Sequence, residues 1–173
     1  MWGVSLVGLS QQIVLILAVV ISAGSFGISL QKDFLLQSKK SDVGKGLCYG
    51  IAAQYLVVPV VTYPFIWIFD IDANRISEPA RELSDKATSP IGVIAIILTV
   101  GLLAPFAEEL FFRGLLYGSI RKRGDSARNQ KLIVWTSVVI SSAIFSAIHF
   151  QLLLFPALFV VGMIFALIYE RSG

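Results

Sequence analysis

Two adjacent carboxylates and a guanidinium lie inside a long apolar stretch, in the segment APFAEELFFRGLLY at residues 104–117. An ionised Glu or Arg at the middle of a membrane helix costs roughly 2.5–3.5 kcal/mol, even on lenient insertion scales. Glu108, Glu109 and Arg113 must therefore face protein or trapped water and partly neutralise one another. Such a cluster is a candidate functional site. The competing interpretation is a buried ion pair that only fastens helices together.

Helical spacing predicts different roles for the two glutamates. Glu109 and Arg113 are related as i and i+4, with the acid nearer the N-terminus, which is the favourable order for an ion pair. Glu108 lies about 100° round the helix and is left as the spare carboxylate. A spare carboxylate in such a site is suited to take a proton from water as a general base.

His149 is the only histidine in the chain, so any imidazole chemistry falls to it. It ends another apolar run and shares a predicted helix face with Phe145, with Ser142 and Ser146 close to that face. We expect His149 to lie at a membrane depth similar to that of Glu108. A water held by the two, deprotonated by Glu108, would be a nucleophile for amide hydrolysis. The alternative for His149 is a structural hydrogen bond at the membrane interface.

The composition indicates an integral membrane protein. Of the 173 residues, 56% are hydrophobic and only 14% are charged, and the mean hydropathy is +0.80. A soluble domain has about 25% charged residues and 45–50% apolar ones. The net charge is +3, but the basic residues gather between the apolar runs, so we expect no binding of nucleic acid. The single cysteine, Cys48, cannot form an internal disulfide.

Five apolar runs predict an all-α, polytopic membrane helix bundle with about five transmembrane helices. The runs cover Val4–Leu30, Gly46–Phe69, Pro90–Ile120, Leu132–Phe150 and Leu152–Tyr169. Pro59 and Pro64 predict a kink in the second run, and Pro105 predicts a bend in the third. A short interfacial helix with Ser77 as its N-cap is predicted between the second and third runs. Basic residues concentrate in the loops 31–45 and 121–131, so the positive-inside rule places these on the cytoplasmic or equivalent side.

The pattern Glu108-Glu109-x-x-x-Arg113, followed by Phe145-x-x-x-His149 on the next apolar run, resembles the CAAX-protease and bacteriocin-processing family of intramembrane peptidases. The resemblance implies a membrane helix bundle with a hydrophilic cavity that opens between helices. It also implies an endopeptidase in which the first glutamate, here Glu108, activates water together with the histidine, here His149. Glu109 and Arg113 would complete the catalytic set.

The resemblance covers residues 90–173, which we expect to form the family core of a single membrane domain, 1–173. Residues 1–89 would supply two N-terminal spans and their loops. Phe112 and Phe145 are predicted to contact substrate or to pack beside it. The expected partners are membrane lipid and a hydrophobic or prenylated peptide. The expected location is a multi-pass position in the plasma membrane or an equivalent internal membrane.

One part of the family pattern is not found in this sequence. The family carries a third motif, His-x-x-x-Asn/Asp, on a further helix, and the sequence contains no second histidine. Without those groups the oxyanion of the reaction lacks donors, so we expect impaired peptidase activity. Family members have been described both as metalloproteases and as metal-independent glutamate proteases. Glu108 and His149 fall short of the three protein ligands of a catalytic zinc, so we expect no metal and no other cofactor.

Two other functions stay open at this point. The chain could be a non-catalytic relative, acting as an accessory, immunity or assembly subunit of a larger membrane complex. The unmatched third motif and the Gly114-x-x-x-Gly118 packing pattern favour this interpretation, so the sequence alone leaves the enzyme assignment undecided. Transport of an ion or proton is less consistent with the sequence because no inverted repeat is visible.

Overall fold

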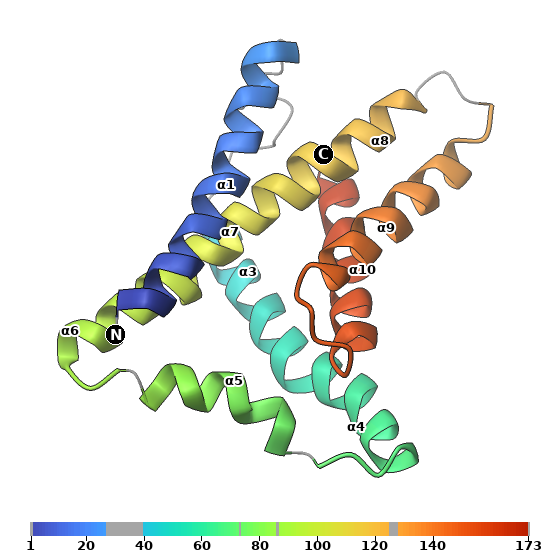
Figure 1. The fold of residues 1–173 in the computed structure, drawn as a ribbon. Coiled ribbons are helices and arrows are strands. Elements are labelled where there is room, and N and C mark those ends of the chain that lie inside the picture. Colours follow the sequence, from blue (N-terminus) through green and yellow to red (C-terminus); the bar gives the residue numbers. More distant parts are fainter. Residues whose placement is uncertain (1, 27–39, 73, 86, 125–127, 173) are drawn as a thin grey trace. The chain divides into compact units, whose positions relative to one another are not determined.

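The computed structural model describes residues 2–26, 40–72, 74–85, 87–124 and 128–172. Every regular element in these ranges is a helix, and no strand occurs among them (Figure 1). This confirms the predicted all-α class. Much of the predicted polar loop at 31–45, and the middle of the basic loop at 121–131, lie outside the described residues.

Three helices of the described ranges are long and apolar enough to cross a membrane. They are Gly44–Ile68, Pro90–Arg123 and Gln130–Ala147. Each overlaps one of the predicted runs, and together they support the assignment of the chain as a membrane protein. Helices also cover the first run as far as Phe26 and the fifth run from Phe155, but the count of five spans and the orientation of the loops stay predictions.

The helices form two compact units, and a short stretch of π-helix is marked η. Unit 1 contains α1 (Trp2–Phe26), α5 (Asn74–Asp85), α6 (Pro90–Ile96), η2 (Ile97–Leu103) and α7 (Ala104–Glu109). Unit 2 contains α3 (Lys40–Ala52), η1 (Ala53–Val57), α4 (Val58–Ile68), most of η3 (Leu110–Tyr117), α8 (Gly118–Arg123), α9 (Gln130–Ala147) and α10 (Phe155–Ser172).

Two of the three prolines that predicted kinks, Pro59 and Pro105, follow a π-helical segment, whereas Pro64 lies inside α4. Pro59 is the second residue after η1, and Pro105 is the second residue after η2. A proline has no N–H for the carbonyl four residues before it, so an α-helix would leave that carbonyl without a donor. In a π-helix a carbonyl accepts from the residue five positions on, which here is the residue after the proline. The wide turns thus let the two helices continue through Pro59 and Pro105.

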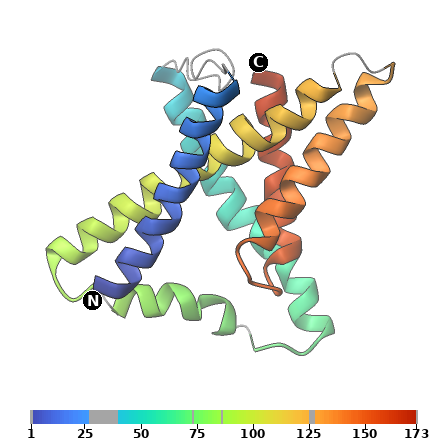
Figure 2. The ribbon, with the colours of Figure 1, turned by 45° about the horizontal axis from the view of Figure 1, so that its top comes forward.

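In unit 1, α1 packs against η2 and α7, and the ribbons cross in both views (Figures 1 and 2). Among the residues of α1 whose burial the structure describes, the buried ones are Gln12, Leu15, Val19 and Ala23. Ala107 is fully buried on α7. Its methyl group lets a neighbouring helix approach closely, as small residues do at helix contacts in membranes. Helix α7, which carries Glu108 and Glu109, is thus packed against α1 within unit 1.

The start of the third run is capped by Ser89, whose hydroxyl accepts a hydrogen bond from the Gly92 N–H at 3.1 Å. The short helix predicted before it is present as α5, but its predicted N-cap is wrong. Helix α5 begins at Asn74, and Ser77 lies within it and donates its hydroxyl to the Asn74 carbonyl at 3.0 Å. A serine inside a helix can bond back to the preceding turn in this way, so it need not mark a helix start.

In unit 2, α9 and α10 lie side by side in both views and pack along their length (Figures 1 and 2). A serine face on α9 makes this close packing feasible. The buried serines are Ser137, Ser141, Ser142 and Ser146. Gly162 of α10 lies against that face, and a Cβ added there would come within 3.0 Å of the Ser142 Cβ. Small residues at a membrane helix contact allow the backbones to approach in this way.

Candidate functional site

The predicted site residues are divided between the two units. Glu108 and Glu109 end α7 in unit 1 and are half-buried, whereas Arg113 follows in η3 and belongs to unit 2. The helix itself is continuous from Pro90 to Arg123. The i,i+4 argument assumes an α-helix, but Arg113 lies in η3, which winds more widely. That argument therefore does not settle the pairing of Glu109 with Arg113, which stays a prediction.

Arg113 is almost completely buried, with 2% of its surface exposed. The guanidinium carbon lies 4.8 Å from the centre of the Phe145 ring and 5.6 Å from that of Phe165. Both distances are within the range of a cation–π interaction, in which the negative face of the ring attracts the cation. Desolvation strengthens this attraction, so the rings provide part of the environment that a buried guanidinium needs.

Phe145 is the centre of this arrangement. The ring of Phe112 meets the Phe145 ring edge to face, with 5.2 Å between the ring centres. The centre of the His149 ring lies 4.7 Å from that of Phe145. Edge-to-face pairs bring the positive rim of one ring onto the negative face of another. We call Phe112, Arg113, Phe145, His149 and Phe165 the aromatic cluster. The sequence pattern singled out four of these five residues, and it missed Phe165.

His149 does not lie on the fourth helix, as its apolar run predicted. Helix α9 ends at Ala147, and His149 occupies the turn that follows. Phe150 has a φ of 52°, the left-handed conformation in which helices commonly end. The apolar run continues past the end of the helix. Hydropathy therefore could not predict this end, because it does not report backbone conformation. A non-glycine residue with positive φ is uncommon and stores some backbone strain.

The imidazole of His149 nevertheless reaches back to the helix. Its Nδ1 lies 2.7 Å from the carbonyl oxygen of Phe145. A carbonyl can only accept, so Nδ1 carries the proton, and in the neutral ring Nε2 keeps its lone pair. This bond caps one of the last carbonyls of α9. The predicted structural hydrogen bond therefore exists, and it also fixes the tautomer that leaves Nε2 open to proton transfer.

The two serines of α9 that precede His149, Ser142 and Ser146, differ in their hydrogen bonding. Ser146 donates its hydroxyl to the Phe155 carbonyl at 2.6 Å, so it is committed to the start of α10. The Ser142 hydroxyl is buried and has no hydrogen-bond partner among the described residues. It lies beside Gly162, where an added Cβ would come within 3.2 Å of the hydroxyl oxygen.

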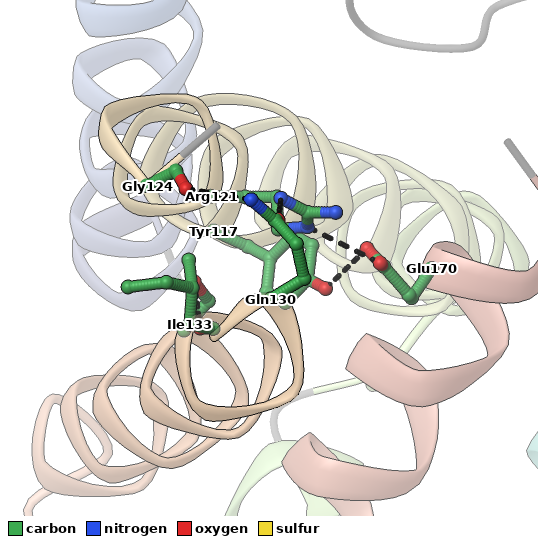
Figure 3. Close-up of polar contacts among 7 residues, drawn as sticks. Tyr117, Arg121, Gly124, Gln130, Ile133 and Glu170 are labelled. Atoms are coloured by element: carbon green, nitrogen blue, oxygen red, sulfur yellow. Dashed lines mark hydrogen bonds and ion pairs between the residues drawn. The ribbon is translucent and has the colours of Figure 1, made fainter. Parts of the chain in front are cut away.

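A second group of polar side chains joins the ends of three helices in unit 2 (Figure 3). Glu170 of α10 accepts from the Tyr117 hydroxyl at 2.5 Å and from the Arg121 Nε at 3.2 Å, which forms an ion pair. Arg121 also donates to the Gln130 amide oxygen of α9 at 2.9 Å. Gln130 in turn donates to the Gly124 carbonyl at 3.0 Å. We call Tyr117, Arg121, Gln130 and Glu170 the polar clasp.

The polar clasp sits on an apolar core. Tyr117, Val138 and Ala166 are almost fully buried in it, from three different helices. The Tyr117 ring also meets the Tyr169 ring edge to face, with 5.8 Å between the centres. The clasp was not predicted from the sequence. A carboxylate at the end of the last apolar run, close in depth to the basic loop, was the signal that could have indicated it.

No group of three or more His, Cys, Asp or Glu side chains within the described ranges could hold a metal ion. The prediction that the chain needs no metal stays a prediction, and the chemistry proposed below uses none.

Comparison with known proteins extends this picture beyond the geometry. Residues 90–173 match the family described as type II CAAX prenyl endopeptidase Rce1-like. A protein of Escherichia coli, the "Uncharacterized 24.3 kDa protein", is 37% identical over 84 residues, which are 47% of this chain and 36% of that protein. The chain thus spans little more than a third of the curated relative that it matches. No solved structure matches the chain.

The matched segment is the one that the sequence motifs indicated. It begins at Pro90, includes the two glutamates and Arg113, and runs past His149 through α10. The three candidate membrane helices agree with a family of intramembrane peptidases. Residues 90–173 of this membrane protein therefore match the Rce1-like family of type II CAAX prenyl endopeptidases, in agreement with the resemblance that the motifs indicated.

Proposed function

We propose that the chain acts as an intramembrane endopeptidase in which Glu108 is the general base and His149 orients the attacking water. The observation that carries the proposal is the bond from His149 Nδ1 to the Phe145 carbonyl, within the family's second motif. A histidine held by one ring nitrogen keeps the other in a fixed direction for hydrogen bonding or proton transfer. The roles of Glu109 and Arg113 come from the sequence pattern and stay part of the proposal.

The proposed substrate is a prenylated or otherwise hydrophobic peptide that reaches the protein from the membrane. Such a peptide partitions into the bilayer because each buried CH₂ group of its lipid chain contributes about 0.8 kcal/mol. The protein would hold it while water attacks the scissile carbonyl. We propose a multi-pass arrangement in the plasma membrane or an equivalent internal membrane, and no cofactor.

The test is to purify the chain in detergent and to measure cleavage of a farnesylated peptide by wild type, Glu108→Gln and His149→Ala. General acid–base groups contribute about 10²–10⁴-fold, so each substitution should reduce the rate by at least about a hundredfold. Glu78→Gln is the matched control for the carboxylate, because Glu78 is exposed on α5. Gln151→Ala, at an exposed position close to His149, is the control for the loop.

Cleavage that survives in Glu108→Gln would overturn the proposed mechanism. No cleavage by wild type, together with recovery of the chain in a stable membrane complex, would favour the accessory-subunit function that the sequence left open.

A further inference from the structure

Segment η3 is the π-helical stretch that proline does not explain. The other two, η1 and η2, each lead into a proline, whereas Leu110–Tyr117 contains none and is followed by Gly118. A π-helical turn has poorer geometry than an α-helical turn and is frequently found at functional sites. Its persistence over η3 therefore needs contacts that hold it from outside.

Such contacts are present at both ends of the part of η3 in unit 2. At its start, Phe112 and Arg113 are buried in the aromatic cluster. At its end, Tyr117 is 1% exposed and donates its hydroxyl to Glu170 at 2.5 Å. The segment is thus attached to α9 at one end and to α10 at the other.

The polar clasp fixes the rotation of this helix about its own axis. Tyr117 is the last residue of η3 and Arg121 belongs to α8, yet both donate to the one carboxylate of Glu170 (Figure 3). Two attachments on successive turns leave little freedom of rotation. If η3 relaxed to α-helical winding, residues before Tyr117 would turn about the axis, because the number of residues per turn would fall. Arg113 would then leave the Phe145 ring.

We propose that the polar clasp is a positioning device that maintains the π-helical winding of η3 and so holds Phe112 and Arg113 in the aromatic cluster. The part of the inference that concerns catalysis rests on the proposed peptidase function. The effect of the clasp on η3 can be measured without catalysis. Glu170, Tyr117 and Arg121 are positioning residues in this sense.

The experiment compares Tyr117→Phe, Glu170→Ala and Glu170→Gln in the full chain. Two quantities are read: the hydrogen exchange of the amides of residues 110–117, and kcat and KM for a farnesylated peptide. Tyr117→Phe is the conservative variant, because it keeps the ring and removes only the hydroxyl. Arg171→Ala is the control, since Arg171 is the exposed neighbour of Glu170.

Loss of a hydrogen bond to a charged group should speed exchange in η3 by about tenfold or more and lower kcat by a similar factor. KM should stay within about twofold, because the proposal places no clasp residue against the substrate. Glu170→Gln should fall between Glu170→Ala and wild type, because its amide oxygen can still accept from Tyr117. Arg171→Ala should match wild type in both readouts.

Exchange in η3 that is no faster in Tyr117→Phe and Glu170→Ala than in Arg171→Ala would overturn the inference. Faster exchange with unchanged kcat would overturn it too, because the clasp would then stabilise the fold without positioning the cluster. If wild type cleaves nothing, the proposed function fails, and the exchange result alone decides whether the clasp controls η3.

Discussion

Arg113 and Arg121 lie on the same helix and in the same unit, yet the chain accommodates their charges in different ways. Arg113 is 2% exposed, and its guanidinium lies over the rings of Phe145 and Phe165. The Arg121 side chain is 26% exposed and pairs with the Glu170 carboxylate, itself 28% exposed. The cation of the aromatic cluster is therefore buried against ring faces, and the cation of the polar clasp pairs with an anion near water.

The difference follows from desolvation. A buried ion pair has to offset the hydration lost by two charged groups, and the attraction between them often fails to exceed that loss. An aromatic ring is weakly hydrated, so placing it against a buried guanidinium costs less desolvation free energy. Near the end of a helix both charges keep part of their water, and an ion pair is then tolerated. The contrast predicts that the cluster tolerates substitution less than the clasp.

The largest effect is expected for Arg113→Lys. Lysine keeps the charge but lacks the planar guanidinium that stacks on rings, and its ammonium is more strongly hydrated. The free energy of unfolding should fall by about 2 kcal/mol or more, the size of a desolvated cation–π interaction. Thermal unfolding in detergent, followed by circular dichroism, measures the loss.

Arg121→Lys is the matched control for this substitution. A lysine at position 121 can still pair with Glu170, and exposed pairs contribute only about 0–1 kcal/mol. Equal losses for the two variants would contradict the contrast between cluster and clasp.

A smaller effect is expected for Gly162→Ala on α10. The added Cβ would come within 3.0 Å of the Ser142 Cβ and within 3.2 Å of its Cα, so the two helices would have to separate. Overpacking of this kind costs about 1–3 kcal/mol. Because Phe165 follows one turn later, the separation should disturb the aromatic cluster more than the clasp. The fall in melting temperature measures the cost.

Gly50→Ala separates the steric effect from helix propensity. Nothing lies within 4 Å of a Cβ added at Gly50, so the alanine there should be neutral or stabilising by up to about 1 kcal/mol. If Gly162→Ala were equally harmless, the close approach of α9 and α10 at Ser142 would not be limiting.

The sequence predicted the parts of the molecule that depend on local pattern. Long apolar runs predicted the helices, and the spacing of Phe145 and His149 predicted a contact that the structure contains. Hydropathy could not predict where α9 ends, because the stop depends on the positive φ of Phe150. The wide winding of η3 was also beyond prediction, since the i,i+4 rule assumes an α-helix throughout.

Contacts between distant residues were missed for a different reason. Phe165 and Glu170 lie on α10, which carried no motif, and the bond from Tyr117 to Glu170 joins residues 53 positions apart. Only the packing of α10 against its neighbours brings these side chains together. The roles of Glu108 and Glu109 came from the motif alone and stay predictions.

The smallest effect is expected for Gln130→Ala in the polar clasp. Gln130 is exposed and bridges Arg121 to the Gly124 carbonyl through two hydrogen bonds of 2.9 and 3.0 Å. Water can replace both bonds at an exposed site, so the free energy of unfolding should fall by at most about 1 kcal/mol. A loss of unfolding free energy comparable to that of Arg113→Lys would contradict the contrast between the two groups. It would mean that the exposed Gln130 contributes as much stability as a residue of the buried aromatic cluster. Lys131→Ala, at the next exposed position of α9, is the control for helix propensity, and chemical unfolding in mixed detergent resolves the small difference.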